Sequence, residues 1–426
     1  MQKVGVALLG LGVVGSGTYK ILIGQHDKIR EIYDIDLTVE HVLERNAEKI
    51  DALGIDRSIA STDIENVLKN DDIKIVAEFF GGIEPAKSFL VKCLLAGKSV
   101  VTSNKELVCK HFAELEAAAA KGKAGLYFEA SCVGGVPIIR TLTDAMQGND
   151  IREIHGIING TTNYILTRMA DEGLDYKGAL AAAQRLGYAE ADPTADTQGY
   201  DAAYKLSILS SLAYNKHVPL SEIYREGIDK IGAEDIAFGK EFGMTVKLLG
   251  ISKNIDGKIE ARVHPVFIKD DHPLASVKGS FNAVHLNGNN VGDIMLYGRG
   301  AGDLPTGSAI VSDIVFAAGK SAHKRYNFFK NKLTSKDFVK DFSSEYYIRM
   351  KVTDKAGTLS KISGIFGKFG VSITTVLQKP PTDDSGIVSI IFITHMTHEK
   401  AITKAIEAIG SLDGVNEISN LIRVEG

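Results

Sequence analysis

The first third of the chain alternates between short apolar runs and longer runs in which apolar residues have helical spacing. Val4–Gly10 is a continuous apolar run, which is typical of a strand buried on both faces of a sheet. Similar runs cover residues 37–43, 73–80, 99–101 and 125–129. Helical patterns cover residues 85–95 and 105–120. Strands that alternate with helices in this way predict an α/β domain with a doubly wound parallel sheet.

The middle of the chain mixes helical and strand-like patterns in another order. The helical patterns cover residues 177–186, 206–212 and 308–318, with helix-like segments near Ser221 and Ala233. The strand-like runs lie near residues 247–252, 260–267 and 282–286. This order predicts an α+β domain.

The last part of the chain has a third pattern, with strand-like runs and helices in the order βαββαβ. The strand-like runs cover residues 346–352, 371–377, 387–394 and 415–424, and the helical patterns cover 360–369 and 398–409. This order predicts a ferredoxin-like module. The module carries no cluster of reactive side chains, so we expect it to sense a ligand or to assemble subunits.

Length and composition restrict the class of protein. A chain of 426 residues suggests two or three domains. The formal charge of -4 and the pI near 6.3 provide no broad basic surface, so we expect small metabolites rather than nucleic acid or a membrane. Residues 320–340 are locally basic, and we interpret them as a linker or docking segment. Cys93, Cys109 and Cys132 form no disulfide framework or metal motif, which favours the cytoplasm.

A glycine-rich turn follows the first strand directly. Gly10, Gly12 and Gly15 have the spacing of a dinucleotide-binding loop. Gly10 permits the tight turn, Gly12 lets the backbone approach a pyrophosphate, and Gly15 allows close helix packing. The helix N-terminus at Val13 and Val14 attracts the negative charge. We therefore expect a Rossmann-type nucleotide site, and an ordinary strand-to-helix turn is the alternative.

The end of the second strand carries signals for the choice of cofactor. Arg45 could hold the 2′-phosphate of NADP, whereas Glu44 could accept the ribose hydroxyls of NAD. We favour NADP and keep NAD open.

A lysine follows the strand at 99–101, at the carboxyl edge where open α/β sheets bind ligands. Ser103, Asn104 and Lys105 occupy this position, which makes Lys105 a candidate functional residue. The structural alternative is that Asn104 caps a helix and Lys105 is solvated in its first turn.

The densest group of charged residues lies between Glu190 and Lys205. It contains Glu190, Asp192, Asp196, Asp201 and Lys205. The proline after Asp192 stops a helix, so the first carboxylates lie on a turn, whereas Asp201 and Lys205 share one face of a helix. Because apolar segments flank the group, we interpret it as a buried site with a ligand or a proton to handle. A solvated turn with an ordinary ion pair is the alternative.

Three further turns are candidates for binding. The carbonyl groups of residues 129–137 could wrap a cation or face a nicotinamide, or the segment could be a plain crossover. The turn at 159–163 offers small polar groups for a carboxylate, or it caps a helix. Residues 297–307 form a second glycine-rich loop, which could close over a nucleotide or serve as a connector.

Taken together, these motifs resemble homoserine dehydrogenase with a C-terminal ACT domain, along nearly the whole chain. The matching motifs are Gly10–Gly15, Ser103–Lys105, Phe128–Ala130, Gly134–Pro137, Asn159–Asn163, Gly187–Pro193, Asp201–Lys205, Tyr297–Gly302 and, for the ACT domain, Asp354–Ile362. The resemblance implies reversible hydride transfer between NAD(P)H and L-aspartate 4-semialdehyde, which gives L-homoserine on the route to threonine and methionine. It also implies a homodimer or homotetramer.

The resemblance implies four regions. Residues 1–135 are the NAD(P)-binding Rossmann domain, and 136–307 are the substrate-binding, catalytic and oligomerisation domain. Residues 308–340 are a helix that returns to the nucleotide domain, followed by a linker. Residues 341–426 are the ACT regulatory domain.

The resemblance also implies roles for individual residues. Lys205 is the cation that stabilises the developing alkoxide, and Lys105 is a second lysine near the nicotinamide and the hydroxyl. Asp201 orients Lys205 and takes part in proton transfer, and either lysine could be the proton donor. Glu190 and Asp196 receive the substrate ammonium group, and Thr161 and Gly160 meet its carboxylate or its chain. The implied cofactor residues are Gly10, Gly12, Val13, Val14, Gly15, Arg45, Ser103, Lys105 and Gly302.

Two further ligands follow from the resemblance. A sodium ion is expected on the backbone carbonyl groups of Glu129, Cys132, Gly134 and Val136. Feedback inhibition by L-threonine is expected at the ACT domain, and Asp354 and Gly357 are its candidate residues. A purely oligomerising module is the alternative.

Two rival functions use the same residues differently. A semialdehyde dehydrogenase would use Cys132 as a nucleophile and His155 as its base, but it gives Asp201 and Lys205 no role. A non-catalytic sensor would use the nucleotide fold and the last module only for binding. The intact acid and lysine cluster argues against the sensor.

Overall fold

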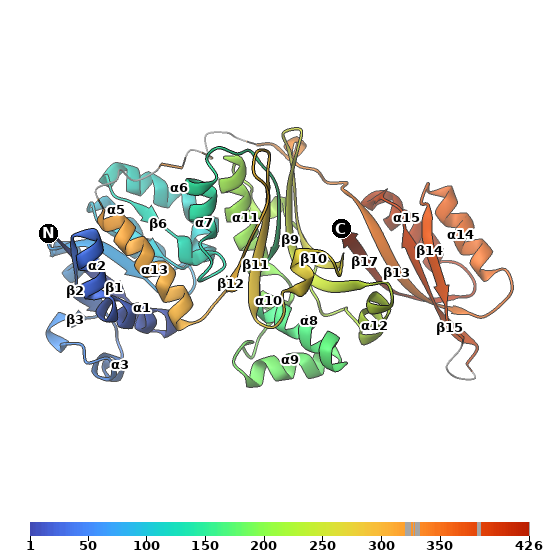
Figure 1. Ribbon diagram of the computed structural model, residues 1–426, viewed down its shortest axis with the longest axis horizontal. Coiled ribbons are helices and arrows are strands. Elements are labelled where there is room, and N and C mark those ends of the chain that lie inside the picture. Colours follow the sequence, from blue (N-terminus) through green and yellow to red (C-terminus); the bar gives the residue numbers. More distant parts are fainter. Residues whose placement is uncertain (320–324, 327, 329–332, 381–384, 426) are drawn as a thin grey trace. The chain divides into compact units, whose positions relative to one another are not determined.

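The computed structural model describes residues 1–319, 325–326, 328, 333–380 and 385–425 (Figure 1). The chain forms two compact units, each assembled from separate stretches. The first unit combines Met1–Gly160, Asp201–Ile223 and Phe281–Thr334, and the second combines Thr161–Tyr200, Tyr224–Ser280 and Ser335–Gly426. The predicted linker at 320–340 lies partly outside the described residues. None of the described helices is long and apolar enough to cross a lipid bilayer.

The first unit contains a six-stranded sheet in the order β3-β2-β1-β4-β5-β6. Its strands are β1 (Gln2–Leu9), β2 (Ile35–Leu43), β3 (Ala60–Ser61), β4 (Ile73–Glu78), β5 (Ser99–Thr102) and β6 (Leu126–Tyr127). All neighbours pair in parallel, which confirms the predicted doubly wound sheet. The strand expected at 125–129 is shorter, because Glu129–Ser131 form a turn of 3-10 helix.

Helices connect these strands as the alternating pattern predicted. They are α1 (Val13–Gly24), α2 (His26–Tyr33), α3 (Ala47–Ala52), α4 (Ile64–Lys69), α5 (Ala86–Leu95) and α6 (Lys105–Gly122). A further helix, α13 (Asp303–Ala318), comes from much later in the chain and lies beside α1 (Figure 1). Gly17 of α1 permits this approach, because a Cβ atom there would lie 2.4 Å from the carbonyl oxygen of Asp303. Ile310 and Ile314 of α13 join the apolar core of the sheet.

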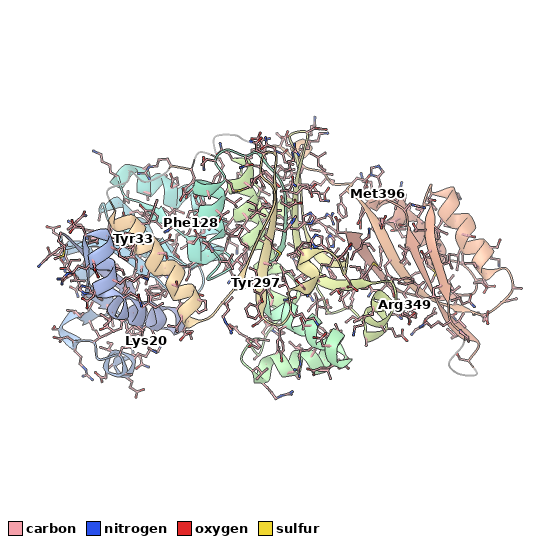
Figure 2. The ribbon with its side chains drawn as sticks, in the orientation of Figure 1. Lys20, Tyr33, Phe128, Tyr297, Arg349 and Met396 are labelled. Atoms are coloured by element: carbon pink, nitrogen blue, oxygen red, sulfur yellow. The ribbon has the colours of Figure 1, made fainter. Side chains whose placement is uncertain are left out.

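The rest of the first unit includes an antiparallel sheet in the order β12-β11-β7. Its elements are β7 (Ile151–Ile157), β11 (Phe281–Gly288), β12 (Gly292–Arg299), α7 (Ile138–Arg140) and α11 (Tyr200–Tyr214), which belongs to this unit from Asp201 onward. The prediction of a loop over 297–307 is wrong at both ends, since Arg299 ends β12 and Asp303 begins α13. Tyr297, labelled in Figure 2, stacks on Phe281 of β11 with ring centroids 5.0 Å apart, which extends the strand pair.

The second unit has helices and a long hairpin, as expected for an α+β domain. These elements are α8 (Gly160–Glu172), α9 (Tyr176–Arg185), α10 (Thr194–Thr197), β8 (Tyr224–Arg225), α12 (Ala233–Glu241), β9 (Met244–Ile255) and β10 (Lys258–Lys269). Asp256 and Gly257 join β9 to β10, and both have positive φ angles, of 51° and 87°. A two-residue turn of this kind matches the twist of the strands that it joins.

The C-terminal module has the predicted βαββαβ order and a ferredoxin-like sheet, β17-β13-β15-β14. Its elements are β13 (Ser343–Thr353), α14 (Thr358–Lys368), β14 (Ile373–Gln378), β15 (Ile387–Thr394), the short β16 (Thr397–His398), α15 (Glu399–Gly410) and β17 (Val415–Glu425). Ile362 and Phe366 of α14 and Ile402 of α15 pack on the same sheet face, in one apolar core.

The C-terminal module continues the sheet of the hairpin within the second unit. β17 pairs in parallel with β10, with Phe267 opposite Val424. Three largely buried arginines form ion pairs near this junction, and Arg349 is the one labelled in Figure 2. The pairs are Arg262 Nε with Glu260 Oε1 at 2.7 Å, Arg349 Nε with Asp235 Oδ1 at 2.6 Å, and Arg423 Nη1 with Glu226 Oε2 at 2.5 Å. The junction is thus held by backbone pairing and by buried charge.

Candidate active site

Helix α11 places Asp201 and Lys205 one turn apart on the same face, as the spacing predicted. Lys205 Nζ donates to Asp201 Oδ2 at 2.7 Å and to the carbonyl oxygen of Ile158 at 2.8 Å. The side-chain amide of Asn159 also donates to Asp201 Oδ2, at 2.9 Å. Both charged side chains are buried, so this pair differs from an ordinary solvated ion pair.

Lys105 approaches the same carboxylate from the nucleotide-binding sheet. Its Nζ lies 3.0 Å from Asp201 Oδ1, so that each oxygen of Asp201 faces one ammonium group. The Lys105 side chain is 40% exposed, compared with 10% for Lys205, which leaves Lys105 open to a ligand. The predicted trio of Lys105, Asp201 and Lys205 is therefore brought together, with an excess of one positive charge.

The charge state of Asp201 follows from its surroundings. Burial alone would raise the pKa of Asp201, but the ammonium groups of Lys205 and Lys105 outweigh it and hold the pKa well below its usual range. Asp201 is therefore ionised at neutral pH. A carboxylate between two lysines balances one of them and leaves the charge of the other available for an oxyanion.

Behind Lys105 lies a buried glutamate that the sequence analysis missed. Glu78, at the end of β4, accepts hydrogen bonds from the Thr102 hydroxyl and the Phe80 amide, both at 2.5 Å. Thr102 Oγ1 accepts from the amide of Asn104 at 3.0 Å, and Asn104 Oδ1 accepts from the Leu107 amide at 3.0 Å, which caps α6. Lys105 begins this helix, so the chain of hydrogen bonds from Glu78 fixes its backbone.

Burial also sets the charge of this glutamate, because it raises the pKa of Glu78 to about 7. The sequence signal for Glu78 is a carboxylate at the last position of a mostly apolar parallel strand. Asn104 caps α6, as the structural alternative for this turn predicted. Lys105 belongs to the cluster around Asp201, as the functional interpretation predicted.

The dinucleotide loop has the geometry that its glycines predicted. Gly10 has φ of +100°, and a Cβ atom on Gly15 would lie 2.2 Å from the carbonyl oxygen of Gly10. A Cβ atom on Gly12 would meet nothing within 4 Å, which leaves the open space that a pyrophosphate needs. The residues present therefore fit a dinucleotide at the start of α1.

The Glu44 carboxylate is hydrogen-bonded to backbone amides of the dinucleotide loop and of the residues after β2. Its carboxylate accepts from the Leu11 amide at 2.7 Å and from the Arg45 and Asn46 amides at 2.9 Å each. Burial would raise the pKa of Glu44, but these hydrogen bonds and Lys49 leave it lowered. Arg45 is exposed beside it. Both predicted signals for cofactor choice are thus present at the end of β2.

The turn after β6 is strained and closely packed. Val133 and Gly134 both have positive φ, of 58° and 54°. A Cβ atom on Gly134 would lie 2.4 Å from the carbonyl oxygen of Gly300, so the turn packs against the loop before α13. Among the described residues, no group of three or more His, Cys, Asp or Glu side chains can hold a metal. A cation here would depend on carbonyl oxygens, which suit a hard ion such as sodium.

The side chain of Glu129, in the turn after β6, has a structural role. The Glu129 carboxylate accepts from the amides of Ile139 and Arg140, both at 2.8 Å. Arg140 Nη2 also pairs with Asp313 of α13 at 2.6 Å. Burial, together with the charge of Asp313, raises the pKa of Glu129 to about 7. The side chain therefore anchors α7 and α13, and only its backbone carbonyl is a candidate ligand.

Cys132 lacks the features of a nucleophile. Its side chain is fully buried, and burial raises the pKa of the thiol to about 12. A catalytic cysteine needs an accessible thiolate and a base. The geometry thus argues against the semialdehyde dehydrogenase alternative. The three thiols of the chain, at Cys93, Cys109 and Cys132, are all free.

The roles of several other predicted site residues stay untested. Thr161, Glu190 and Asp196 belong to the second unit, where the Thr161 hydroxyl donates to the carbonyl oxygen of Tyr188 at 2.7 Å. Gly160 is the last residue of the first unit's opening stretch. Their substrate roles stay predictions, as do the cofactor roles of Val13, Val14, Ser103 and Gly302.

The candidate effector residues are described with the C-terminal module. Gly357, with φ of +90°, caps α14, and Asp354 Oδ1 accepts from the side-chain amide of Gln378 at 3.3 Å. Their regulatory role is also an untested prediction.

A nucleotide loop together with a lysine pair that can protonate an oxyanion provides what hydride transfer to a carbonyl group requires. Residues 10–129 match the description "Homoserine dehydrogenase, NAD binding domain", residues 137–315 match "Homoserine dehydrogenase", and residues 346–414 match the ACT domain. The fold and site thus define an NAD(P)-dependent oxidoreductase with an ACT domain.

Whole-chain relatives narrow this class. The chain is 38% identical over 432 residues to the homoserine dehydrogenase of Bacillus subtilis (strain 168), covering 100% of this chain and 99% of that protein. It is similar to the crystal structure of a homoserine dehydrogenase from Thiobacillus denitrificans, with 36% identity, a TM-score of 0.90 and coverage of 100% and 99%. The chain belongs to the homoserine dehydrogenase family, as the motifs indicated.

A more distant solved structure covers less of the chain. A hyperthermophilic archaeal homoserine dehydrogenase in complex with NADPH is 28% identical, with a TM-score of 0.64, and covers 74% of this chain and 98% of that one.

Proposed function

We propose that the chain catalyses reversible oxidation of L-homoserine to L-aspartate 4-semialdehyde, with NADP as the preferred cofactor, on the route to threonine and methionine. The observation that carries the proposal is the position of Asp201 between the ammonium groups of Lys205 and Lys105, at 2.7 and 3.0 Å. Membership of the homoserine dehydrogenase family supplies the substrate pair.

The chain's own residues handle the proton. When bound, the nicotinamide supplies the hydride to the carbonyl carbon, or accepts it in the reverse direction. As charge develops on the substrate oxygen, an ammonium proton of Lys205 moves to it, and Lys105 adds a second positive charge nearby. Asp201 keeps the Lys205 side chain on the inner face of α11. Glu190 and Asp196 would hold the substrate ammonium group, and Thr161 and Gly160 its carboxylate.

The preference for NADP rests on Arg45 at the end of β2. Its guanidinium can pair with a 2′-phosphate, while the Glu44 carboxylate is already engaged by backbone amides. The archaeal relative in complex with NADPH supports this choice. NAD stays the second candidate.

We also propose a sodium ion on the backbone carbonyl groups of Glu129, Cys132, Gly134 and Val136. The positive φ of Gly134 and the absence of an acidic metal cluster in the described ranges are consistent with an ion held by carbonyl oxygens alone. The ion would fix the turn between the nucleotide sheet and α7.

The remaining proposals concern organisation and control. The domains are residues 1–135 for the nucleotide, 136–307 for substrate and oligomerisation, 308–340 for the returning helix and linker, and 341–426 for the ACT domain. The ACT domain would bind L-threonine through Asp354 and Gly357 in a homodimer or homotetramer. A cytoplasmic location fits the three free thiols.

The deciding experiment is the absorbance change when L-homoserine is mixed with the purified chain and NADP+ at alkaline pH. We expect homoserine-dependent NADPH formation, with a lower rate when NAD+ replaces NADP+. No signal with either cofactor, from a folded sample, would contradict the proposal. Cys132→Ser should keep most of the activity, because the thiol has no role in this chemistry.

A further inference from the structure

Helix α8 of the second unit is held along one face by the segment at residues 277–279. Asn163 and Thr167 are four residues apart, so they lie on the same face of the helix. The Asn163 side-chain amide donates to the carbonyl oxygen of Val277 at 3.2 Å, and the Thr167 hydroxyl accepts from the Gly279 amide at 3.1 Å. The first two turns of α8 are thus fixed by hydrogen bonds.

A buried lysine of β9 joins this contact. Lys247 Nζ donates to Asn163 Oδ1 at 3.1 Å and to the carbonyl oxygen of Val277 at 2.5 Å. Lys247 is 2% exposed and Asn163 is 1% exposed, so the contact is shielded from solvent. Asn163 is the fourth residue of α8. The ammonium group of Lys247 therefore lies next to the first turn of the helix.

No carboxylate balances the charge of Lys247 at this contact. Among the described residues, its hydrogen bonds go to one amide oxygen and one carbonyl oxygen, which are both neutral. Burial, with a smaller contribution from the charge of Lys278, lowers the pKa of Lys247 to about 8, although Asp171 acts in the opposite direction. The side chain is therefore largely charged at neutral pH. A buried charge without a counter-ion costs free energy, and an anion bound nearby would recover part of it.

The first turn of α8 contains Thr161, which the proposed function assigns to the substrate carboxylate. The N-terminus of a helix has free amide groups and a partial positive charge. We propose that the Lys247 ammonium group adds to this charge, and that Lys247 is a positioning residue for the substrate carboxylate. This inference rests on the proposed function. Because Lys247 acts through α8 and not on the reacting atoms, its loss should weaken substrate binding more than hydride transfer.

A second buried lysine shows what a purely structural role looks like. Lys98 is 5% exposed and donates to the carbonyl oxygens of Asn70 and Ile73 at 2.7 and 2.9 Å. It directly precedes β5, whereas ligands of open α/β sheets bind at the carboxyl ends of the strands. Loss of either lysine should reduce stability, but only loss of Lys247 should change the affinity for substrate.

The test compares the steady-state kinetics of Lys247→Met and the wild type at neutral pH. We expect the KM for L-homoserine to rise about tenfold, with kcat changed by less than about threefold. The Kd of NADPH, measured by fluorescence titration, should be unchanged. Two controls should keep the wild-type KM. They are Lys98→Met and Lys278→Met, the latter an exposed lysine that pairs with Asp171 of α8 at 2.9 Å.

A second variant, Asn163→Asp, tests the charge without removing the lysine. It keeps an oxygen beside Lys247 Nζ and adds a carboxylate that balances the ammonium ion, so the fold should be retained while the KM rises. The pH dependence separates charge from hydrogen bonding. Because Lys247 loses its proton near pH 8, the ratio of the Lys247→Met KM to the wild-type KM should be largest at neutral pH and decline above pH 8.

The outcomes separate this inference from the proposed function. An unchanged KM in Lys247→Met, with an active wild type, overturns the inference and leaves the proposed reaction intact. A KM ratio that stays constant with pH also overturns it, because hydrogen bonding alone would then account for the effect. If Lys247→Met does not fold, the KM of Asn163→Asp decides in the same way. An inactive wild type contradicts the proposed function, and this inference with it.

Discussion

Buried ion pairs of two kinds occur in the chain, and they differ in the sign of their excess charge. In the first unit, one carboxylate, Asp201, faces the two lysines Lys105 and Lys205. In the second unit, each buried arginine faces two carboxylates. These groups are Arg262 with Glu260 and Glu425, Arg349 with Asp235 and Glu234, and Arg423 with Glu226 and Glu399.

The difference separates a reacting group from a structural one. Arginine does not release a proton at working pH, and two carboxylates satisfy its planar fork, so nothing is left to act on a substrate. Lysine can give up a proton, and a single shared carboxylate leaves positive charge unbalanced. An excess of lysine over carboxylate thus indicates chemistry, and an excess of carboxylate over arginine indicates assembly.

The largest effect is expected from Lys205→Ala, which removes the proposed proton donor. We expect kcat for homoserine oxidation to fall roughly 10³-fold, with cofactor binding and folding retained. Steady-state kinetics and a nucleotide titration measure this. The matched control is Lys98→Met, since Lys98 is a buried lysine whose hydrogen bonds within the described residues go to the carbonyl oxygens of Asn70 and Ile73. It should lose stability and keep kcat, and a normal kcat in Lys205→Ala would remove the assignment.

Asp235→Asn tests the arginine clusters. It leaves Arg349 with its more exposed partner Glu234, and we expect the free energy of unfolding to fall by about 3 kcal/mol in urea denaturation. Turnover by the folded fraction should be unchanged. Replacing both groups, as Arg349→Met with Asp235→Leu, should restore most of the stability. Equal losses in the single and double variants would mean that the cluster contributes more than ion pairing.

Asp201→Asn is expected to reduce kcat about 10²-fold, because Lys205 loses its orienting partner. Steady-state kinetics with L-aspartate 4-semialdehyde measure this, and an unchanged kcat would contradict the orienting role of Asp201.

Glu78→Gln should have the smallest effect on turnover, a fall in kcat of about tenfold, because Glu78 acts only by positioning Lys105. Its signature is the pH dependence of stability. The pKa of Glu78 is raised from 4.5 to about 7 in the fold, so its contribution is fully present below about pH 4.5 and is lost as pH rises through 7. The stability of the wild type relative to the variant should therefore decline over this range.

Two results decide this last prediction. Thr102→Ser keeps a hydroxyl beside Glu78 and should retain both kcat and the pH dependence. A stability difference between wild type and Glu78→Gln that is constant with pH would show that Glu78 does not titrate in the fold.

The parts of the site that the sequence predicted depend on local spacing. Asp201 and Lys205 are four residues apart on one helix, and the glycine fingerprint lies within a single turn. The strand and helix order was likewise readable from periodicity.

The missed parts depend on contacts distant in sequence. Glu78 meets Thr102 across two strands, and Arg349 meets Asp235 114 residues earlier, so no window of the sequence holds both partners. β17 pairs with β10 through backbone groups, which leave no side-chain pattern. The predicted loop over 297–307 is too long, because the glycines near the end of β12 interrupt the alternation of apolar and polar residues that indicates a strand.

The return of α13 to the first sheet has a consequence for synthesis. Ile310 and Ile314 belong to the same apolar core as Leu8 and Val101, yet they leave the ribosome long after those residues. At about 5–20 residues per second, the nascent nucleotide domain waits on the order of ten seconds or more for the helix that covers it. During that interval the apolar face of the nucleotide domain is exposed. We therefore expect the nascent chain to depend most on chaperones before α13 has been synthesised.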